Sequence, residues 1–320
     1  MIIIRFSGGL GNQIYQYVLL RKLQLKYSDV PIKIDLSFYQ QNNVHNGFEM
    51  EKIWGIFGKG IQVAEDRELL KVKYEVPYEA MGISSEKLIK LVAWLNARSR
   101  WIFTKAGFRN EIKEEIQNRT GSFDKQDVNE LIRKLDHINT KKNYYIDGYW
   151  QNELFFRGVL PKVLEELCLP NFKDSFNIEL EDRIKKYPSA GIHVRRGDYV
   201  NRAYDILTPE YYKSAIQYIE SQGDVYKYYI FTDDARYVER EFSFLKNKYI
   251  VRHNTGEKSW CDMKLMSLCK YNILANSSFS NWAGYFNRNE DKIIAYPSQY
   301  TKEEKNTDKF GKGWVKITLK

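Results

Sequence analysis

The first 35 residues show the order of apolar and polar positions that predicts a strand, a turn, a helix and a second strand. Residues 2–4 form an unbroken apolar run, and residues 12–27 carry apolar side chains at helical spacing. Residues 31–35 then alternate between apolar and polar positions, as a strand does. This order predicts a parallel unit in which a crossover helix joins two strands.

The second half of the chain repeats this rhythm more regularly. Strands are expected at residues 190–195, 228–232, 249–251, 272–275 and 292–295, and helices at residues 209–221, 235–244, 260–270 and 278–286. Alternating strands and helices predict an α/β fold whose parallel sheet is covered by helices on both faces. A linker between the two halves is expected from about Pro170 to Pro188.

Residues 84–119 differ from the rest because basic and aromatic side chains are frequent in them. One or two helices are expected here, with an apolar stripe of Leu88, Leu91, Val92 and Leu95. Two interpretations stay open. The segment packs on the core of the first half, or it docks on an anionic membrane that presents a lipid-linked glycan.

The composition of the chain indicates which class of partner it binds. The 320 residues are enough for about two domains, and their formal net charge of +9 favours anionic partners such as nucleotides. No apolar run is long enough for a membrane helix, and no zinc-finger or RNA-recognition signature is present, so no nucleic-acid partner is expected. The three cysteines fit neither a zinc site nor a disulfide framework, which favours a reducing cytoplasm.

The first candidate cluster lies at the end of the strand expected at residues 190–195. Alternation places His193 and Arg195 on one face of this strand, and Arg196 and Asp198 follow in a glycine turn. Adjacent arginines at a strand end can hold a diphosphate by bidentate hydrogen bonds. The alternative is a surface arginine pair that forms salt bridges with Asp198.

Two further strand ends carry polar clusters. Asp233 and Asp234 can accept hydrogen bonds from a ribose or base, or can cap the next helix. The third cluster can bind an anion at a helix start or only cap that helix, and it consists of Asn276, Ser277, Ser278, Phe279 and Ser280. Ligands of open parallel sheets bind outside the carboxyl ends of strands, so the three clusters are expected to converge.

Residues 8–13 form a glycine-rich turn between the first strand and the first helix. This turn lacks the last glycine of a dinucleotide fingerprint and the Lys-Ser/Thr pair of a P-loop. Gly9 and Gly11 indicate that another group approaches the backbone closely, or that the turn needs a positive φ. Asn12 and Gln13 add hydrogen-bonding side chains.

No metal site is expected. The chain has no Asp-x-Asp triplet to bridge a diphosphate to a metal, and its four histidines lack the spacing of metal ligands. Arginines are the expected substitute for a metal. The segment from Ser259 to Asp262 matches a capping box. Helix capping alone can explain Asp262, which is therefore left out of the catalytic set.

Five segments together resemble the α-1,2-fucosyltransferase family, glycosyltransferase family 11: residues 8–13, 148–151, 192–199, 231–234 and 262–280. The resemblance runs from the first strand to about Pro297, and the last segment, which reads DMKLMSLCKYNILANSSFS, is the most specific. The chain departs from the family pattern at Asn281, where a second tryptophan is usual, and at Thr232, where serine is usual.

The resemblance implies a GT-B-like α/β fold in which two Rossmann-like domains face each other across a cleft. Residues 1–170 are then an N-terminal acceptor-side domain with the basic and aromatic insertion, and residues 171–320 a C-terminal domain that binds the GDP-sugar. The resemblance also implies GDP-L-fucose as the donor, inversion at the fucose anomeric carbon, and no metal or other cofactor.

The expected mechanism follows from these residues together with the resemblance. Arg195 and Arg196 stabilise the leaving diphosphate, with Asp198 or His193 as the base, although Asp198 alternatively only orients an arginine. Residues 8–13, 233–234 and 276–280 complete the donor site.

The expected acceptor is a galactose-containing oligosaccharide or lipid-linked glycan of a bacterial surface polysaccharide. Synthesis is expected in the cytoplasm, with peripheral contact at the inner face of the membrane as an option. Two other hypotheses are a transferase with a different donor or acceptor, and a catalytically silent glycan- or nucleotide-binding protein.

Overall fold

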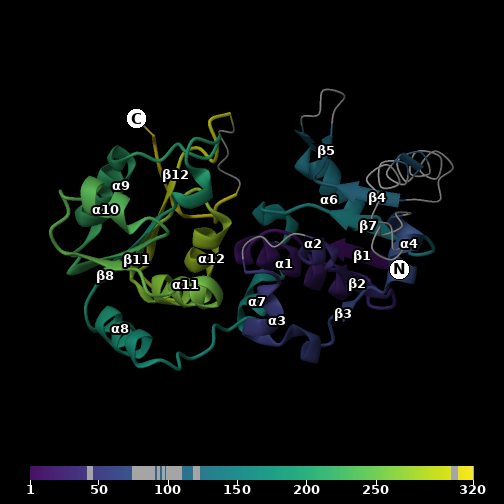
Figure 1. Ribbon diagram of the computed structural model, residues 1–320, viewed down its shortest axis with the longest axis horizontal. Coiled ribbons are helices and arrows are strands. Elements are labelled where there is room, and N and C mark those ends of the chain that lie inside the picture. Colours follow the sequence, from purple (N-terminus) through teal and green to yellow (C-terminus); the bar gives the residue numbers. More distant parts are fainter. Residues whose placement is uncertain are drawn as a thin grey trace.

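The computed structural model describes residues 1–41, 46–73, 91, 94–95, 98, 110–117, 123–303 and 309–319. Over these residues the chain forms one larger sheet in each half, with helices around both (Figure 1). Every strand pair in these two sheets is parallel. This arrangement confirms the predicted α/β class with two Rossmann-like units.

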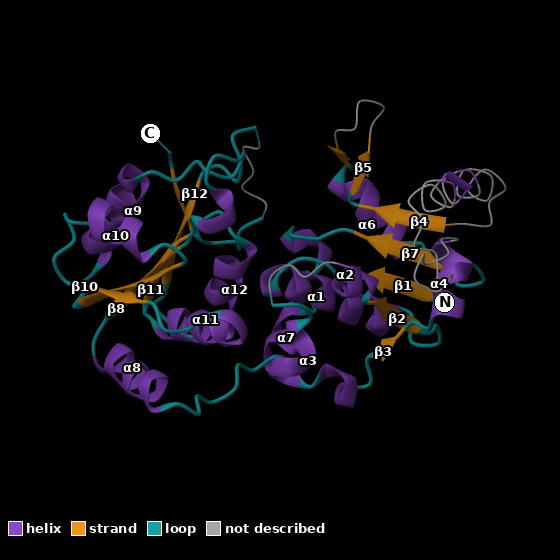
Figure 2. Ribbon diagram, viewed as in Figure 1, coloured by secondary structure: helices purple, strands orange, loops and turns teal. Residues whose placement is uncertain are grey.

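The first sheet has the strand order β3-β2-β1-β7-β4. Its strands are β1 (Ile2–Arg5), β2 (Ile32–Asp35), β3 (Gln62–Val63), β4 (Asn110–Lys113) and β7 (Tyr144–Asp147). A small antiparallel pair, β5 (Glu115–Gln117) and β6 (Phe123–Lys125), follows β4. The arrows of β1, β4 and β7 point towards the second half of the molecule, so the loops after these strands face it (Figure 2).

Helix α1 is buried along most of its length rather than on a single stripe. It packs on β1 and β2 on one side and on a helix of the second half on the other, which explains why its polar Gln13 and Gln16 are also buried. The helices of the first half are α1 (Leu10–Lys26), α2 (Ser37–Gln41), α3 (Glu49–Trp54), α4 (Asp66–Lys73), α6 (Val128–Asp136) and α7 (Leu160–Glu166), with 3-10 turns η1 (Ile56–Lys59) and η3 (Glu153–Phe155).

The second sheet has the strand order β10-β9-β8-β11-β12-β13. Counted along the chain from β8, this is the order 3-2-1-4-5-6 of doubly wound sheets. Its strands are β8 (Ser189–Val194), β9 (Lys227–Thr232), β10 (Lys248–Val251), β11 (Tyr271–Ile273), β12 (Ile293–Pro297) and β13 (Val315–Ile317). The first five confirm the predicted strands, and β13 had not been predicted.

Helices cover both faces of the second sheet, as expected. Ile192 and Val194 of β8 share one core cluster with residues of α9 and α10, whereas α11 and α12 contribute to a different cluster. The helices of this half are α8 (Ser175–Lys186), α9 (Pro209–Gln222), α10 (Ala235–Glu241), α11 (Ser259–Leu268) and α12 (Ser278–Phe286), with 3-10 turns η4 (Gly197–Tyr199) and η5 (Gly256–Lys258).

The two halves are joined through α1 and α12. Trp282 of α12 is fully buried, and its ring centre lies 4.7 Å from that of Tyr15 of α1 and 6.2 Å from that of Phe156. The largest core cluster therefore contains residues of both halves. Asn281, the departure from the family pattern, donates a hydrogen bond to the Tyr15 hydroxyl over 3.2 Å, so this position belongs to the junction.

Two connecting segments, residues 170–188 and 84–109, were given specific expectations from the sequence. The linker expected from Pro170 to Pro188 is not all loop, because α8 forms within it. Most of residues 84–109, Leu88 and Val92 included, lie outside the described residues. Leu91, Trp94 and Leu95 of this segment are described as helical and are about half exposed.

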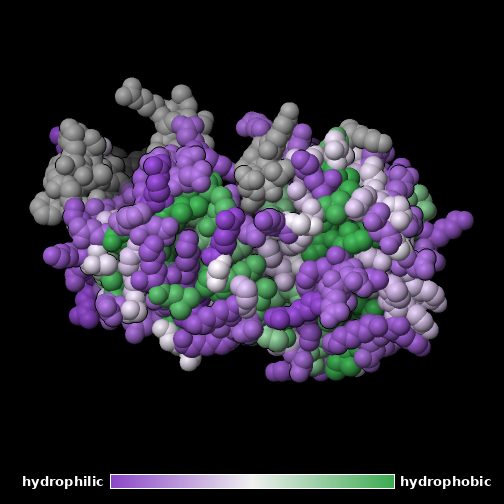
Figure 3. Space-filling model, turned by 180° about the vertical axis from the view of Figure 1, so that it is seen from behind, coloured by the Kyte–Doolittle hydropathy of each residue, from purple (hydrophilic) through white to green (hydrophobic). Residues whose placement is uncertain are grey.

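The surface seen from behind is mainly hydrophilic, with hydrophobic residues gathered in separate areas (Figure 3). Within the part of the chain that the structure describes, no helix has both the length and the apolar character needed to cross a bilayer.

Candidate functional site

Each sheet has a switch point, where the chain stops extending one side of the sheet and begins the other. This point lies between β1 and β7 in the first sheet and between β8 and β11 in the second. Ligands of open α/β sheets bind outside the carboxyl ends of the strands at such points. The loops after these four strands contain residues 8–13, 148–151, 195–199 and 276–280, so the topology pairs four of the segments singled out in the sequence.

The two switch points meet where α1 and α12 begin. A Cβ atom on Gly11 would lie 2.5 Å from the backbone nitrogen of Phe279 and 2.7 Å from Oγ of Ser278. Trp282 donates a hydrogen bond from Nε1 to the Gly11 carbonyl oxygen over 2.9 Å. Gly11 is therefore required by a close approach, as predicted, and the approaching group is α12. The positive-φ interpretation applies to Gly8, whose φ is 77°.

Arg195 lies between two carboxylates and beside an aromatic ring. Its Nη2 donates to Oδ1 of Asp198 over 2.6 Å, and its Nη1 lies 2.8 Å from Oδ2 of Asp233. Its guanidinium carbon lies 5.4 Å from the centre of the Tyr199 ring. One cation between two carboxylates leaves this cluster net negative, so an anionic ligand must displace a carboxylate to bind Arg195.

Arg196 points away from Arg195, which corrects the prediction that the two arginines hold one diphosphate. Its Nη1 donates to Asp205 over 2.6 Å, and its guanidinium carbon lies 4.3 Å from the centre of the Tyr237 ring. Tyr237 belongs to α10, on the face of the sheet that carries Ile192. Both arginines follow the end of β8, and Arg196, with φ −125° and ψ −75°, directly precedes the 3-10 turn η4. The separation comes from their different partners, because Arg195 bonds Asp198 and Asp233 whereas Arg196 bonds Asp205.

His193 is a buried, neutral imidazole. Burial, and after it the positive charge of Arg195, lower its pKa to about 3. Its Nδ1 has no hydrogen-bond partner among the described residues, and its ring centre lies 5.5 Å from that of Phe279. His193 is only 6% exposed, whereas the Asp198 side chain is 48% exposed. Of the two expected bases, Asp198 is therefore the one that an acceptor hydroxyl can reach.

The two aspartates after β9 already have structural partners. Asp233 accepts a hydrogen bond from the backbone N–H of Arg196 over 2.8 Å, and its Oδ2 would lie 2.6 Å from a Cβ atom on Gly197. Asp233 thus holds the loop that follows β8. Asp234 accepts a hydrogen bond from the backbone N–H of Tyr237 over 3.0 Å, so the capping alternative is the correct one for this residue.

The loop after β11 divides into a structural part and an open part. Asn276 and Ser280 are buried and donate hydrogen bonds to backbone carbonyl groups. Ser277 caps α12 by accepting a hydrogen bond from the backbone N–H of Phe279 over 3.3 Å. Ser278 and Phe279 are partly exposed and lie against the start of α1. Of the five predicted residues, Ser278 has its side chain beside Gly11 of the first half, while the centre of the Phe279 ring lies 5.5 Å from that of His193.

Gln13 was predicted to complete the donor site from the first half, but its side chain does not face the second half. It is fully buried, and its Nε2 donates to the carbonyl oxygens of Gly8 and Gly47 over 3.1 and 2.9 Å. Its Oε1 accepts a hydrogen bond from the backbone N–H of Glu49 over 2.9 Å. The side chain thus connects loops of the first half, because burial of α1 requires its polar groups to be satisfied internally.

Asn12 keeps the position that the sequence suggested for it. It is partly exposed at the start of α1, and its Oδ1 accepts a hydrogen bond from Nε2 of Gln151 over 2.7 Å. Gly9 is the residue directly before α1, and its carbonyl oxygen accepts from the backbone N–H of Asn12 over 2.9 Å. The two loops of the first switch point are therefore bonded to each other.

Asp262 has a different role from the helix cap that its sequence pattern suggested. It is partly buried and accepts a hydrogen bond from Nδ2 of Asn254 over 2.8 Å, while the Ser259 hydroxyl donates to Glu49 over 3.2 Å. Removal of its carboxyl group from water raises the pKa of Asp262 to about 7. A carboxyl group with such a pKa is a candidate functional group. The sequence signal for Asp262 was its position as the first residue of the segment 262–280 that resembles the family.

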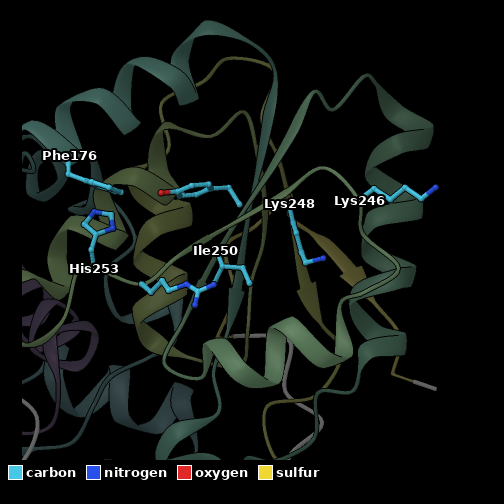
Figure 4. A pocket seen from close by; sticks show the side chains of 7 residues that line it. Phe176, Lys246, Lys248, Ile250 and His253 are labelled. Carbon is cyan, nitrogen blue, oxygen red and sulfur yellow. The ribbon is translucent and has the colours of Figure 1, made fainter.

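A surface hollow of about 620 Å³ lies away from these loops, at the edge strand β10. Figure 4 shows Phe176 beside His253 on one side of it and Lys246 directed away from them. Two of its cations have partners, since Arg252 pairs with Glu239 over 2.6 Å and Lys248 donates to a backbone carbonyl over 3.0 Å. We assign no ligand to this hollow. Among the described residues, no group of three or more His, Cys, Asp or Glu side chains is placed to hold a metal ion.

Comparison with known proteins gives two kinds of similarity. A family model described as Glycosyl transferase family 11 matches residues 101–318. The O-antigen biosynthesis glycosyltransferase WbnK of Escherichia coli is 26% identical over 308 residues, which cover 92% of this chain and 93% of that protein. The alpha-1,2-colitosyltransferase of Escherichia coli is 26% identical over 333 residues, covering 99% of each chain.

Among solved structures, NodZ alpha-1,6-fucosyltransferase soaked with GDP-fucose aligns with a TM-score of 0.48 and 14% identity, covering 89% of this chain and 92% of that chain. POFUT1 in complex with GDP aligns with a TM-score of 0.45 and 11% identity, covering 92% of this chain and 97% of that chain.

Proposed function

The chain belongs to glycosyl transferase family 11, and on this premise we propose that it transfers L-fucose from GDP-L-fucose to a galactoside hydroxyl. The proposed product has an α-1,2 linkage and is formed with inversion at the fucose anomeric carbon. The proposed acceptor is a galactose-containing oligosaccharide or lipid-linked glycan of a bacterial surface polysaccharide, an O-antigen or a capsule. The name of the relative WbnK supports this class of pathway.

The observation that carries the proposal is the meeting of the two switch points at Gly11, Ser278 and Phe279. His193 lies beside Phe279, and Arg195 directly follows the end of β8, so a nucleotide-sugar at this junction has a cation within reach. We propose that residues 171–320 bind the GDP-sugar there and that residues 1–170 form the acceptor side.

The proposed chemistry begins with an exchange of partners at Arg195. The diphosphate takes the place of Asp198 on the guanidinium group, and Ser278 at the start of α12 contacts the same phosphates. The bond between fucose C1 and the diphosphate oxygen then breaks, while the acceptor oxygen bonds to C1 from the opposite face. Arg195 stabilises the negative charge that develops on the leaving group.

The same exchange frees a carboxylate for the acceptor. Asp198 is half exposed, at 48%, and once released from Arg195 it can accept the proton of the attacking hydroxyl. We propose that positive charge from Arg195 and from the helix start serves where other transferases use a metal, which implies activity without added metal. Asn12 completes the site from the first half.

A second candidate differs only in the sugar that is transferred. The relative named as an alpha-1,2-colitosyltransferase matches this chain at the same identity as WbnK and over 99% of both lengths. Colitose is L-fucose without its 3-hydroxyl group. A site that hydrogen-bonds this hydroxyl discriminates strongly between the two sugars, whereas an apolar site does not.

The test is a donor screen with the purified protein. GDP-L-fucose and GDP-colitose are each offered with a panel of galactosides, with and without EDTA, and the linkage of the product is determined. Transfer of L-fucose to the 2-hydroxyl with EDTA present is the expected result. Preferred transfer of colitose selects the second candidate. If the protein neither transfers nor slowly hydrolyses either donor, the result supports the hypothesis of a catalytically silent binding protein.

Peripheral contact with the membrane is part of the same proposal. Leu91, Trp94 and Leu95 are 51%, 55% and 49% exposed, and Arg98 lies over the Trp94 ring at 5.4 Å. Exposed apolar side chains next to a cation are suited to an anionic lipid surface. The protein is expected to sediment with anionic liposomes at low salt, and a Trp94→Ala, Leu95→Ala variant is expected to sediment less. Absence of binding by the parent protein contradicts this contact.

A further inference from the structure

The turn after β7 has an unusual backbone for its sequence. Trp150 has a φ of 59°, a conformation that is costly for a bulky residue and rare outside glycine. A tryptophan held in this conformation needs surrounding structure that determines it. Conformations of this kind concentrate at functional sites.

A single carboxylate fixes this turn. Oε2 of Glu114 accepts hydrogen bonds from two consecutive backbone N–H groups, that of Tyr149 over 2.6 Å and that of Trp150 over 2.9 Å. The preceding Gly148 passes so close that a Cβ atom there would lie 2.6 Å from Cβ of Glu114. Two charge-assisted hydrogen bonds stabilise the positive-φ turn. Glu114 had no signal in the sequence because it lies between two short strands.

The consequence of this turn is that neighbouring aromatic side chains point in opposite directions. Trp150 is fully buried, with its ring centre 5.1 Å from that of Phe155. Tyr149 is 40% exposed. The next residue, Gln151, holds Asn12 through its side-chain amide over 2.7 Å. The turn therefore presents Tyr149 outwards at the first switch point while it anchors a proposed donor-binding residue.

A second exposed tyrosine lies nearby on the other half. Tyr204 is also 40% exposed, and its ring centre lies 4.9 Å from that of Tyr199. Tyr199 in turn lies beside the guanidinium group of Arg195 at 5.4 Å. Tyr204 is tied to the loop before α12, because Asn276 donates from Nδ2 to the Tyr204 carbonyl oxygen over 3.0 Å. The start of α12 lies against Gly11, and the neighbouring Asn12 is held by Gln151 of the Tyr149 turn. Tyr149 and Tyr204 therefore lie on the two sides of the same junction.

The charges around Tyr149 indicate which part of the reaction takes place there. Among the described residues, Arg5 is paired with Asp147 over 3.1 Å, and the carboxyl group of Glu114 lies directly against the turn, 2.6 Å from the backbone nitrogen of Tyr149. The cation and the carboxylates nearest Tyr149 therefore belong to the protein's own contacts, which disfavours a diphosphate at this ring. This surface suits a neutral ligand with apolar faces and hydroxyl edges, because tyrosine presents an apolar ring and a polar tip.

We propose that Tyr149 and Tyr204 form the binding surface for the acceptor sugar, and that Glu114 is the positioning residue that presents Tyr149. This inference rests on the proposed glycosyl transfer, and it places the acceptor at the junction next to Arg195 and Asp198. An acceptor held between tyrosines of both halves binds only when the halves are in register, which couples acceptor binding to closure of the donor site.

The test compares Tyr149→Ala and Tyr204→Ala with Tyr226→Ala, a matched control. Tyr226 is 62% exposed and packs on Tyr187, away from the switch points. We expect each of the first two variants to raise the KM for the galactoside about tenfold, the effect of losing one aromatic contact. The KM for the GDP-sugar and its acceptor-free hydrolysis are expected to change less than twofold. The control is expected to behave as the parent protein.

The role of Glu114 is tested by comparing the galactoside KM of two variants at this position. Glu114→Gln keeps an oxygen that accepts both backbone hydrogen bonds, so its galactoside KM is expected to stay within about threefold of the parent. Glu114→Ala is expected to match Tyr149→Ala in galactoside KM while acceptor-free hydrolysis of the donor persists. Equal loss of hydrolysis and transfer in Glu114→Ala would indicate a purely structural role and overturn the positioning role.

Direct binding separates this inference from the proposed transfer. Saturation-transfer NMR with the galactoside panel measures acceptor binding without a donor. If the parent protein binds a galactoside and Tyr149→Ala and Tyr204→Ala do not, the binding surface stands even if no donor is turned over. If the parent protein binds none of the panel, or the two variants bind as well as the parent, the inference is wrong whatever the donor screen shows.

Discussion

At the scale of single residues, Arg195 and Arg196 are neighbours in the chain with different surroundings. Arg195 follows the end of β8 and is shared between Asp198 and Asp233. Arg196 lies against Asp205 and the Tyr237 ring. The backbone turns at Arg196, with φ −125° and ψ −75°, and each guanidinium group has its own carboxylate partners. The two arginines are therefore expected to respond differently to substitution.

The first prediction contrasts Arg195→Ala with Arg196→Ala. Arg195→Ala is expected to lower kcat/KM for the GDP-sugar about 10²- to 10³-fold, because it removes a preorganised donor to the leaving group. Arg196→Ala is expected to reduce the free energy of unfolding by about 1–3 kcal/mol, because it removes the cationic partner of Asp205 and leaves that carboxylate with the backbone N–H of Asn201. Kinetics and thermal unfolding measure both, with Arg240→Ala on the exposed side of α10 as control. If both variants lose kcat/KM equally and neither loses stability, the two arginines hold the diphosphate together.

The second prediction concerns Asp198→Asn. Removing this carboxylate leaves Arg195 with one anionic neighbour fewer, so GDP is expected to bind more tightly in calorimetry. Turnover is expected to fall about 10²- to 10⁴-fold, because the proposed base is lost. Tighter GDP binding with unchanged kcat would show that Asp198 only orients Arg195.

At the scale of elements, the starts of α1 and α12 bring the two halves together. The glycine turn before α1 allows the backbone of α12 to come within van der Waals contact, and Trp282 bonds to a carbonyl of that turn. Tyr15 and Asn281 add a hydrogen bond between the same helices. The departure of residue 281 from the family pattern thus falls at the junction, where an amide replaces an aromatic side chain.

The third prediction tests this junction with Gly11→Ala. The added Cβ would lie 2.5 Å from a backbone nitrogen of α12, which cannot move aside as a flexible side chain can. Overpacking of this kind is expected to cost about 1–3 kcal/mol and to lower the Tm. Gly58→Ala is the matched control, since nothing lies within 4 Å of a Cβ atom there. Equal Tm values for the two variants would contradict the close approach.

At the scale of the whole molecule, a buried polar network connects the segment between the halves to the second sheet. Asp262 of α11 accepts from Asn254, which exchanges hydrogen bonds with Asn177 of α8 over 2.9 Å in each direction. Asp174, the N-cap of α8, accepts from the same Asn177. The network ties α8, the loop after β10 and α11 together, so α8 is fixed to the second half.

The fourth prediction is a pH dependence of stability from Asp262. Its pKa is about 7 in the fold, against an ordinary value of 3.8, so the fold disfavours the ionised form. The parent protein is therefore expected to lose stability as pH rises from about 4 to about 7, by up to about 4 kcal/mol. Asp262→Asn keeps an acceptor for Asn254 and does not ionise. Its Tm relative to the parent is expected to increase across this window. A Tm difference between the two proteins that stays constant from about pH 4 to about pH 7 would contradict the raised pKa of Asp262.

Local pattern was sufficient for the first strand-helix-strand unit and for most of the second half. The alternation of apolar runs and helical spacing located α1, β1, β2 and five strands of the second sheet, because each of these segments has strong periodicity of its own. Strands β4 and β7 of the first sheet were not predicted, and neither were β3, β13 and the pair β5–β6, in which two or three residues carry no periodicity. Helix α8 was taken for linker because flanking prolines suggested a boundary.

The side chains of the candidate site depended on context that the pattern does not contain. Asn12 and Ser278 lie where the starts of α1 and α12 meet. Gln13, Asn276 and Ser280 are buried and bond internally, because burial obliges polar groups to find partners within the protein. Asp234 caps α10. Glu114 and the surroundings of Asp262 appear only when segments distant in the chain are brought together.

By itself, the sequence determined the α/β class, the order of most strands and helices, the segments at the strand ends and the absence of known metal-binding patterns, since these follow from local periodicity and residue chemistry. Tertiary structure decided which of those residues face the junction, that the two arginines separate, and that one carboxylate fixes a positive-φ tryptophan beside an exposed tyrosine. These facts depend on strand order and on contacts between distant segments, for which the linear pattern carries no information.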